Sequence, residues 1–432
     1  MNTKGDSPPP ESEGTPEHGR IGFVGTRIHG TDGVSLEADK WAETLAKQGY
    51  TCYFMGGELD TPEDRSYVAE KAHFKHPEIE SVQERCFGVE TRSRETTDQI
   101  QSLKNELKEH IYQFIGRFNL DLLIAENALS IPMNLPLGLA LTEVIAETGI
   151  PAIGHHPPFY SERQRFFANC VWDYINMAFP PHLPCLQHVT INSSGEHQLC
   201  VRCGISGSVI PNVIDFENPP PPVDDYAADV REAFGVDDSV FVLQPTRVVA
   251  RKGIERAVEL VQRLDRRAKL VISHASGDEG EEYERRLREY SRLMNVETEF
   301  VSECISDRRG RDENGNKIYA LSDVYPHADL VTYPSGFEGF GNAFLETIYY
   351  KRPIVVNTYS VYLIDIRPKG FKAIEIPSFV TENTVQQTQE ILADEALRRD
   401  MVEHNYELGR KYFSYHVLER KLRSLVHAAL GA

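Results

Sequence analysis

Short runs of β-branched and aromatic residues alternate with longer segments of helical periodicity, and this alternation constrains the fold more than any other feature of the chain. It predicts parallel strands joined by crossover helices. The alternation occurs twice, which predicts an α/β protein with two doubly wound sheets in tandem. The first series of predicted strands comprises residues 21–25, 51–56, 121–127, 151–156 and 188–194, and the second comprises 239–246, 269–276, 296–303, 329–335 and 353–359.

The division between the two series falls near residues 205–225, which are rich in proline and turn residues. A chain of 432 residues also suits two domains better than one core. The amphipathic segment that ends the chain has no obvious place in the second sheet. The predicted organisation is a disordered tail at 1–20, a first domain at 21–205, a second at 206–410 and a terminal helix at 411–432 that crosses back to the first domain.

The formal charge of −19 limits the possible partners. Such a surface repels nucleic-acid phosphate and anionic lipid, so an anionic ligand needs a local basic pocket. No apolar run reaches the length of a membrane span, and the N-terminus lacks an apolar signal core. We therefore expect a cytoplasmic protein that binds neither nucleic acid nor membrane; its oligomeric state is not indicated.

The seven cysteines are odd in number and scattered, which argues against a secreted disulfide framework. Cys200 and Cys203 form a CxxC pair, but no second pair completes a zinc site, and reduced thiols are expected. Residues 99–118 carry an apolar stripe that fits either a membrane-surface helix or a helix packed on the first sheet. Their polar face mixes acids and bases, which favours packing.

Ligands of open α/β sheets bind at the carboxyl ends of the strands, so the residues after each strand are candidates for a site. Arg247 and Lys252 follow the first strand of the second series. Two cations there suit a diphosphate, whose charge must be neutralised when a bond to it breaks. The alternative is an ordinary basic loop. Arg251 lies between the two cations and could be solvated instead.

The stretch GFEGFGNAFLE at 336–346 follows the fourth strand of that series. Its glycines let the backbone pass close to a ligand. Glu338 is expected on the loop and Glu346 about one turn inside the following helix, with Asn342 as its cap. Carboxylates suit sugar hydroxyls, and the N–H groups of Gly341, Asn342 and Ala343 would point between them.

Polar residues also gather after strands of the first series. His155 and His156 end one strand and precede Tyr160, Arg163 and Arg165, and Asn127 and Asn134 follow the neighbouring strand. After the first strand, Gly30 and Gly33 flank Asp32 before a helix that is expected to start near Ser35. Taken alone, each of these is also compatible with an ordinary turn or a structural histidine.

These residues together resemble glycosyltransferase family 4, whose GT-B architecture has two Rossmann-like domains facing a central cleft. Arg247 with Lys252, PSGFEGFGNAFLE at 334–346 and PNVIDF at 211–216 carry the resemblance, which extends over nearly the whole chain from residue 21. It implies a retaining hexosyltransferase that uses a nucleotide sugar as co-substrate and needs no metal or other cofactor. In the usual proposal for this family, the leaving diphosphate accepts the proton of the acceptor.

The resemblance also implies a role for each matching residue. Glu338 would bind the donor sugar and Glu346 the ribose, Arg247 and Lys252 would hold the diphosphate, and Gly341, Asn342 and Ala343 would offer backbone contacts. His156, or alternatively His155, would lie beside the transferred sugar, and Gly33 near the donor phosphate. Glu303 and Ile305 follow the strand beside which the family holds the base.

The first series faintly resembles enzymes that add mannose or glucose, from GDP-mannose or UDP-glucose, to small compatible solutes of the glucosylglycerate type. Tyr160, Arg163 and Arg165, together with Asn127 and Asn134, would then meet the acceptor. Two alternatives remain open. One is a glycosyl phosphorylase or sugar-nucleotide epimerase on the same plan, and the other is a sugar-binding protein without enzymatic activity.

Overall fold

The computed structural model describes residues 18–30, 33–156, 159–276 and 281–431. Most of the predicted tail at 1–20, and Asp32 in the first loop, lie outside the described residues. By internal contacts the chain forms two compact units: one comprises Met1–Gly154, Arg163–Gln187 and Leu422–Ala432, and the other comprises His155–Glu162 and His188–Lys421. The last helix, α14 (Tyr415–Leu430), contributes residues to both.

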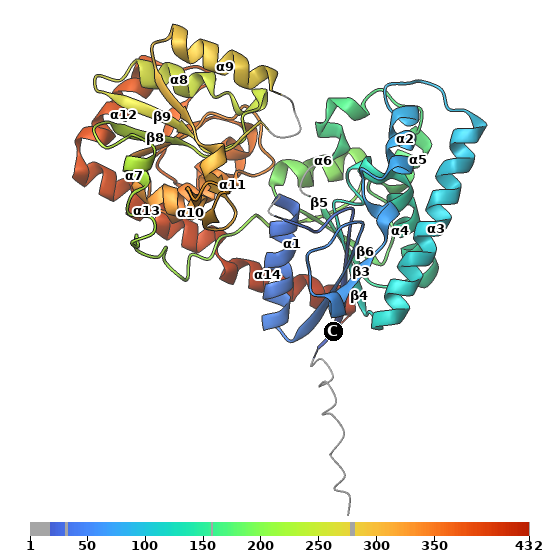
Figure 1. The fold of residues 1–432 in the computed structure, drawn as a ribbon. Coiled ribbons are helices and arrows are strands. Elements are labelled where there is room, and N and C mark those ends of the chain that lie inside the picture. The colour runs from blue at the N-terminus through green and yellow to red at the C-terminus, as the bar shows by residue number, and fades with distance from the viewer. Residues whose placement is uncertain (1–17, 31–32, 157–158, 277–280, 432) are drawn as a thin grey trace, which may run out of the picture. The chain divides into compact units, whose positions relative to one another are not determined.

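The first sheet is parallel and has seven strands in the order β3-β2-β1-β4-β5-β6-β7. Helices connect its strands, as the first series of the sequence predicts (Figure 1). The strands are β1 (Gly19–Gly25), β2 (Tyr50–Gly56), β3 (Ser66–Val68), β4 (Leu122–Glu126), β5 (Ala152–His156), β6 (Leu186–Thr190) and β7 (Ser208–Val209). The helices of this part of the chain are α1 (Gly33–Lys47), α2 (Pro77–Cys86), α3 (Arg94–Phe118), α4 (Leu135–Thr148), α5 (Trp172–Ala178) and α6 (Ser193–Cys203).

The apolar stripe of α3 is buried. Leu107, Ile111 and Phe114 are fully covered and pack with residues of α4 and of β1, β2 and β4 in one core cluster. Side chains three and four positions apart share a helix face, so a single stripe can cover the sheet. The prediction that this helix packs on the first sheet is confirmed.

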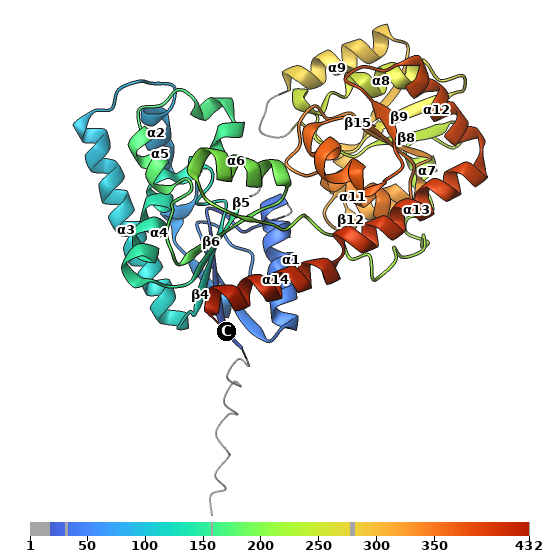
Figure 2. The ribbon, with the colours of Figure 1, turned by 180° about the vertical axis from the view of Figure 1, so that it is seen from behind.

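The second sheet has six parallel strands in the order β10-β9-β8-β14-β15-β16. Alternate residues of its strands enter different core clusters: Val242 and Leu270 pack under α8 and α9, whereas Leu243 and Val271 pack under α7 and α10. Successive side chains of a strand point to opposite faces, so both faces are covered (Figure 2). The strands are β8 (Val240–Gln244), β9 (Ala268–Ile272), β10 (Glu297–Phe300), β14 (Leu330–Tyr333), β15 (Ile354–Asn357) and β16 (Ile374–Ile376). The helices are α7 (Val230–Ala233), α8 (Glu255–Gln262), α9 (Glu282–Leu293), α10 (Leu321–Val324), α11 (Asn342–Tyr349), α12 (Glu382–Ala393) and α13 (Glu395–Phe413).

Every predicted strand is present, but some ends differ. The strand predicted at 188–194 stops at Thr190, because Asn192 caps α6 by accepting a hydrogen bond from the Gly195 N–H at 2.6 Å. The helix expected near Ser35 starts at Gly33. The sequence reading missed β3, β7, β16 and a small sheet of β11 (Ile305–Ser306), β13 (Lys317–Ala320) and β12 (Gly310–Arg311).

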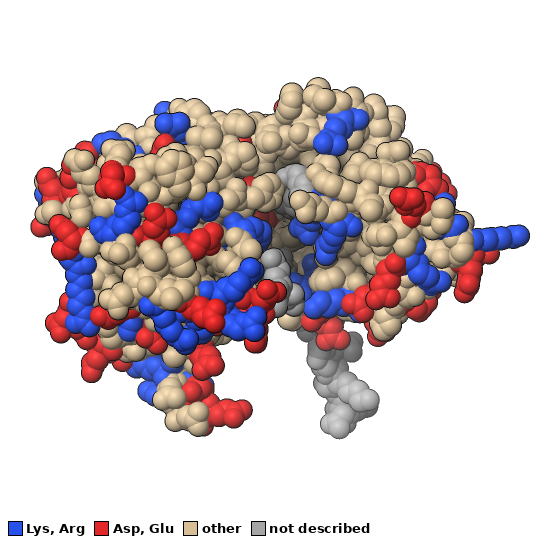
Figure 3. Space-filling view, turned by 90° about the horizontal axis from the view of Figure 1, so that it is seen from above, with Lys and Arg blue, Asp and Glu red and all other residues tan. Residues whose placement is uncertain are grey.

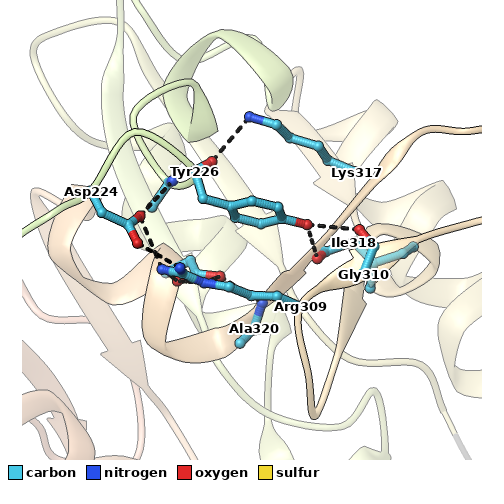
Figure 4. Close-up of polar contacts among 9 residues, drawn as sticks. Asp224, Tyr226, Arg309, Gly310, Lys317, Ile318 and Ala320 are labelled. Carbon is cyan, nitrogen blue, oxygen red and sulfur yellow. Dashed lines mark hydrogen bonds and ion pairs between the residues drawn. The ribbon is translucent and has the colours of Figure 1, made fainter.

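Polar contacts hold this small sheet against the segment that leads into α7 (Figure 4). Arg309 pairs with Asp224 at 2.6 Å, and the Tyr226 hydroxyl donates to the carbonyl oxygens of Gly310 and Ile318 at 2.7 and 2.8 Å. Lys317 Nζ donates to the Tyr226 carbonyl at 3.1 Å. The small sheet starts at Ile305, shortly after the end of β10 at Phe300, so these contacts fix the chain just beyond the carboxyl end of β10.

Acidic and basic side chains are interspersed over much of the face seen in Figure 3. Within the described ranges, no helix is both long and apolar enough to cross a bilayer.

Candidate functional site

The candidate site lies at the carboxyl edge of the second sheet. Because β8 and β14 are adjacent and parallel, the segments that follow them emerge at the same edge. After β8 come Arg247, Arg251 and Lys252; after β14 comes the loop 334–341, which leads into α11. The topology therefore brings the predicted cations and carboxylates together from segments more than 80 residues apart, since Lys252 and Glu338 are separated by 86 positions.

A buried ion pair joins these two segments. Lys252 is 8% exposed and Glu338 is 9% exposed, and Lys252 Nζ donates to Glu338 Oε1. Arg251 Nη1 lies 3.6 Å from the other carboxylate oxygen, so Arg251 belongs to the cluster and is not simply solvated. Burial lowers the pKa of Lys252, and the Glu338 carboxylate opposes that shift. The site thus keeps a cation and an anion in contact where water has little access.

Polar contacts from several elements hold the loop 334–341 in place. Gly336 N–H donates to the Arg251 carbonyl at 2.8 Å, and Asn357 Nδ2 donates to the Ser335 carbonyl at 2.9 Å. Asn192 Nδ2 reaches the Gly339 carbonyl at 2.6 Å. A loop whose backbone is hydrogen-bonded on both sides of Glu338 keeps its shape, so Glu338 is presented by a preorganised backbone.

Gly341 needs to be glycine. Its φ is +129°, a conformation that residues with a side chain rarely adopt. A Cβ there would lie 2.4 Å from the hydroxyl oxygen of Tyr359, which itself donates to the Phe340 carbonyl at 2.9 Å. Tyr359 is fully buried and cannot move aside without breaking that contact.

Gly341→Ala is therefore expected to lower the free energy of unfolding by about 2 kcal/mol or more, because backbone strain and steric overlap act together. Urea unfolding followed by circular dichroism measures this effect. Gly336→Ala in the same loop is the matched control, since its Cβ would lie 3.7 Å from the nearest atom, the Arg251 carbonyl oxygen. Equal stability of the two variants would contradict this reading.

Helix α11 starts at this loop. Gly341 occupies the N-cap position and Asn342 is the first helical residue, so the predicted assignment of Asn342 as the cap is wrong by one position. The Asn342 side chain instead accepts a hydrogen bond from Asn212 Nδ2 at 2.7 Å. The N–H groups of a first helical turn have no intrahelical acceptor, so those of Asn342 and Ala343 are oriented for an anion or a hydroxyl.

Two further basic groups belong to this edge. Arg247 is exposed and lies shortly after the end of β8 at Gln244. His274 follows β9, and its Nδ1 lies 2.7 Å from Ser273 Oγ. Because β9 lies beside β8 in the parallel sheet, His274 emerges at the same edge as Arg247 and Lys252. Burial lowers the pKa of His274, and the charges of Lys252 and Arg247 lower it further. The structure thus adds a histidine that the sequence does not predict for the site, because its position falls at the end of a predicted strand.

Glu346 lies on α11 and is partly exposed. Its Oε2 accepts a hydrogen bond from the hydroxyl of Tyr325 at 2.8 Å. Tyr325 precedes β14 and is also not predicted by the sequence, since no periodic pattern connects residues 21 positions apart in different elements. Glu338 and Glu346 are held separately, one by cations and the other by a tyrosine.

The two histidines of the first sheet are the last residues of β5 and do not lie in a loop. His156 is 1% exposed, and its Nε2 lies 2.9 Å from Nδ1 of His188 on β6, with the rings stacked. Burial and the neighbouring His188 hold the pKa of His156 well below its usual value, so this ring is neutral. His155 is equally buried, and as a strand neighbour it points to the opposite face.

The two predicted asparagines are in different situations. Asn134 caps α4: its Oδ1 accepts from Leu137 N–H at 3.0 Å, and its Nδ2 donates to the carbonyl groups of Lys71 and Ala72. Both the oxygen and the nitrogen of the Asn134 side chain are therefore engaged in hydrogen bonds within the fold. Asn127 follows β4 with φ +60°, and its buried Oδ1 has no hydrogen-bond partner among the described residues.

The remaining predicted residues lie near chain turns. Gly33 is exposed at the start of α1. Tyr160 belongs to a short 3-10 turn, and burial raises the pKa of its hydroxyl. Arg163 is partly exposed, whereas Arg165 is exposed with its guanidinium 4.7 Å from the ring of Phe166.

Metal ligands do not gather in the part of the chain that the structure describes: it contains no group of three or more His, Cys, Asp or Glu side chains that could hold an ion. All seven cysteines are free, and both members of the CxxC pair are exposed on α6.

Two parallel Rossmann-like sheets, with cations after one strand and, after its neighbour, one glutamate in a glycine-rich loop and a second in the helix that follows, define a glycosyltransferase of the GT-B fold. The solved structure of a glycosyltransferase from Rickettsia africae ESF-5 superposes with a TM-score of 0.68 over 96% of this chain and 99% of that one. At 15% identity, this similarity supports the fold alone.

The sequence comparisons are more specific. The profile of the family "Glycosyl transferases group 1" matches residues 228–408. The mannosylglucosylglycerate synthase of Petrotoga mobilis is 32% identical over 83% of this chain and 86% of its own length. That of Thermotoga maritima is 30% identical over 90% and 95%. The chain belongs to the glycosyltransferase family that contains these two synthases.

Proposed function

We propose that the protein transfers a hexosyl group, with retention of configuration, from a nucleotide sugar to a hydroxyl of a small acceptor of the glucosylglycerate type. Mannose from GDP-mannose is the first candidate donor and glucose from UDP-glucose the second. The observation that carries the proposal is the buried Lys252–Glu338 pair at the carboxyl edge of the second sheet. The names of the two relatives supply the acceptor class.

The pair suits a ligand that brings a phosphate and a sugar hydroxyl to the same place. Lys252 would exchange its carboxylate contact for a phosphate oxygen, with Arg247 as the second cation. Glu338 would then accept hydrogen bonds from sugar hydroxyls. The charge on the leaving diphosphate grows as the glycosidic bond breaks, so cations fixed beforehand stabilise the transition state more than the ground state.

The leaving diphosphate would also accept the proton of the attacking hydroxyl on the same face of the sugar. In this proposal Arg247, Lys252 and the N-terminal N–H groups of α11 perform the charge neutralisation that a metal ion supplies elsewhere. His156 or His155 would contact the transferred sugar, and Gly33 would lie near the donor phosphate. Tyr160, Arg163, Arg165 and Asn127 would receive the acceptor, with the arginines facing its carboxylate.

The test is a screen of nucleotide sugars for slow hydrolysis, followed by transfer to small acceptors with detection of the product by mass spectrometry. We expect a hexosylated glucosylglycerate, formed fastest from GDP-mannose, and the same rate after treatment with a metal chelator. The configuration at the new linkage, read by NMR, tests retention. Transfer from none of the nucleotide sugars would overturn the proposal, and loss of activity on chelation would overturn its metal-free part.

His274 makes donor binding dependent on pH. A bound diphosphate adds negative charge beside a histidine whose pKa is low in the free protein, so that pKa rises and a proton is taken up on binding. Affinity for the nucleotide sugar should therefore increase as pH falls from about 8 to about 6.

Calorimetry in two buffers of different ionisation enthalpy measures this proton uptake. A nucleotide sugar is the appropriate ligand because, unlike a free nucleoside diphosphate, it has no terminal phosphate that titrates in this range. His274→Gln should bind without proton uptake, and uptake that persists in this variant would show that another group is responsible.

A further inference from the structure

Tyr325 is a buried residue whose hydroxyl contacts Glu346, one of the two glutamates of the site. It begins a 3-10 turn (Tyr325–His327) between α10 and β14, is 1% exposed, and directs its hydroxyl at Oε2 of Glu346. Glu346 itself is partly open to solvent on α11. The contact therefore links a buried, fixed donor to a carboxylate at the edge of the site.

The position of Tyr325 is fixed by packing. Its ring stacks on that of Tyr350 with centroids 4.9 Å apart and planes 7° from parallel, and it belongs to the apolar cluster that includes Phe241 and Val331 of the sheet. A side chain enclosed in this way has no alternative rotamer available, so the hydroxyl is a stationary point of attachment.

The Tyr325 hydroxyl acts toward Glu346 only as a hydrogen-bond donor. Burial raises the pKa of Tyr325 well above its usual value, and the charge of Glu346 raises it further. The phenol therefore stays protonated and donates to the carboxylate. A hydrogen bond to a charged acceptor is about twice as strong as one between neutral groups, which is enough to select one orientation of a flexible glutamate.

We propose that Tyr325 is a positioning residue that orients the Glu346 carboxylate toward the ribose of the donor nucleotide and so creates the preference for nucleotides with both ribose hydroxyls. This inference rests on the proposed function, in which Glu346 meets the ribose. Tyr325 touches neither the nucleotide nor the sugar in this account and acts only through Glu346.

The test measures the affinity of four probes, GDP, UDP and their 2′,3′-dideoxy counterparts, for the unmodified protein and for Tyr325→Phe, Glu346→Gln and the double variant. The unmodified protein should prefer the ribose form of its nucleotide by roughly tenfold, and each single variant should lose most of that preference. The double variant should lose little more than Glu346→Gln alone, because both changes remove one coupled interaction. Affinity for the dideoxy probes should be nearly unchanged throughout.

Tyr350→Phe is the matched control. It removes the neighbouring hydroxyl, which bonds to Ser322, and keeps the ring stack, so it should retain the ribose preference. Tyr325→Phe keeps its own ring as well, and its partner Glu346 can be solvated, so it should remain folded by circular dichroism. In turnover assays it should raise KM for the donor several-fold with kcat little changed, because the ribose lies away from the reacting carbon.

The outcomes separate the inference from the proposed function. If Glu346→Gln loses the ribose preference and Tyr325→Phe keeps it, the positioning role is wrong and the proposed function stands. If both variants keep the preference, Glu346 does not read the ribose and the inference fails. If the unmodified protein binds none of the nucleotides, the proposed function fails together with the inference.

Discussion

Lys252→Ala is expected to lower kcat/KM for transfer by roughly a thousandfold while the protein stays folded. The substitution removes a buried cation from the position where the leaving diphosphate gains charge. Glu338 is not left alone, because Arg251 Nη1 remains 3.6 Å from its Oε2. Steady-state kinetics and thermal melting measure the two parts of this prediction.

Lys372→Ala is the matched control, because Lys372 also forms an ion pair in the same unit, with Asp400 at 2.5 Å, but on the surface. It should leave kcat/KM unchanged. Full activity of Lys252→Ala would show that Lys252 does not bind the diphosphate. An unfolded Lys252→Ala would show that the lysine is needed for folding.

Glu338→Ala is expected to reduce turnover by roughly a hundredfold to a thousandfold, since sugar hydroxyls lose their acceptor and Lys252 loses its partner. Glu338→Gln keeps the shape and part of the hydrogen-bonding capacity, so it should be less impaired. The difference in turnover between Glu338→Ala and Glu338→Gln separates the contribution of the carboxylate's hydrogen bonds from that of its charge.

Glu338→Ala should also change how stability depends on pH. Burial already lowers the pKa of Lys252 below its unfolded value, and removing Glu338 takes away the charge that opposes this shift. Between the folded and unfolded pKa values the unfolded chain binds more protons, so the stability of the variant should rise with pH toward the unfolded pKa of about 10.4. The double variant with Lys252→Met should lose this slope, and an equal slope in both variants would contradict the assignment.

The sequence predicted the layers of the fold well because hydrophobic periodicity is a local property. All the predicted strands exist, and the stripe of α3 packs as its spacing indicates. The predicted ends of elements were wrong where a side-chain hydrogen bond, and not the local hydrophobic pattern, determines the structure. Asn192 ends β6 early by capping α6, and Asn212 engages Asn342, which was predicted to be a cap.

At the site, the sequence predicted which residues gather after β8 and β14 but not how they are held. The Lys252–Glu338 pair spans 86 positions, and its burial depends on how tightly the two loops pack. Tyr325 was missed because it acts through a contact with another element, which no periodic pattern records, and His274 was missed because it fell within the predicted strand 269–276. The adjacent histidines showed the limit of the sequence most clearly: only the alternation of side chains along β5 separates His156, which pairs with His188, from His155.

The central claim is that the edge of the second sheet binds the diphosphate and ribose of a nucleotide sugar. The measurement that tests it most directly is calorimetric titration of the intact protein with GDP, UDP and inorganic phosphate in turn. The account predicts affinity of about micromolar strength for one nucleoside diphosphate, much weaker binding by Lys252→Ala, and no comparable binding of phosphate. Micromolar binding of phosphate alone, with neither nucleotide bound, would contradict it and favour a glycosyl phosphorylase.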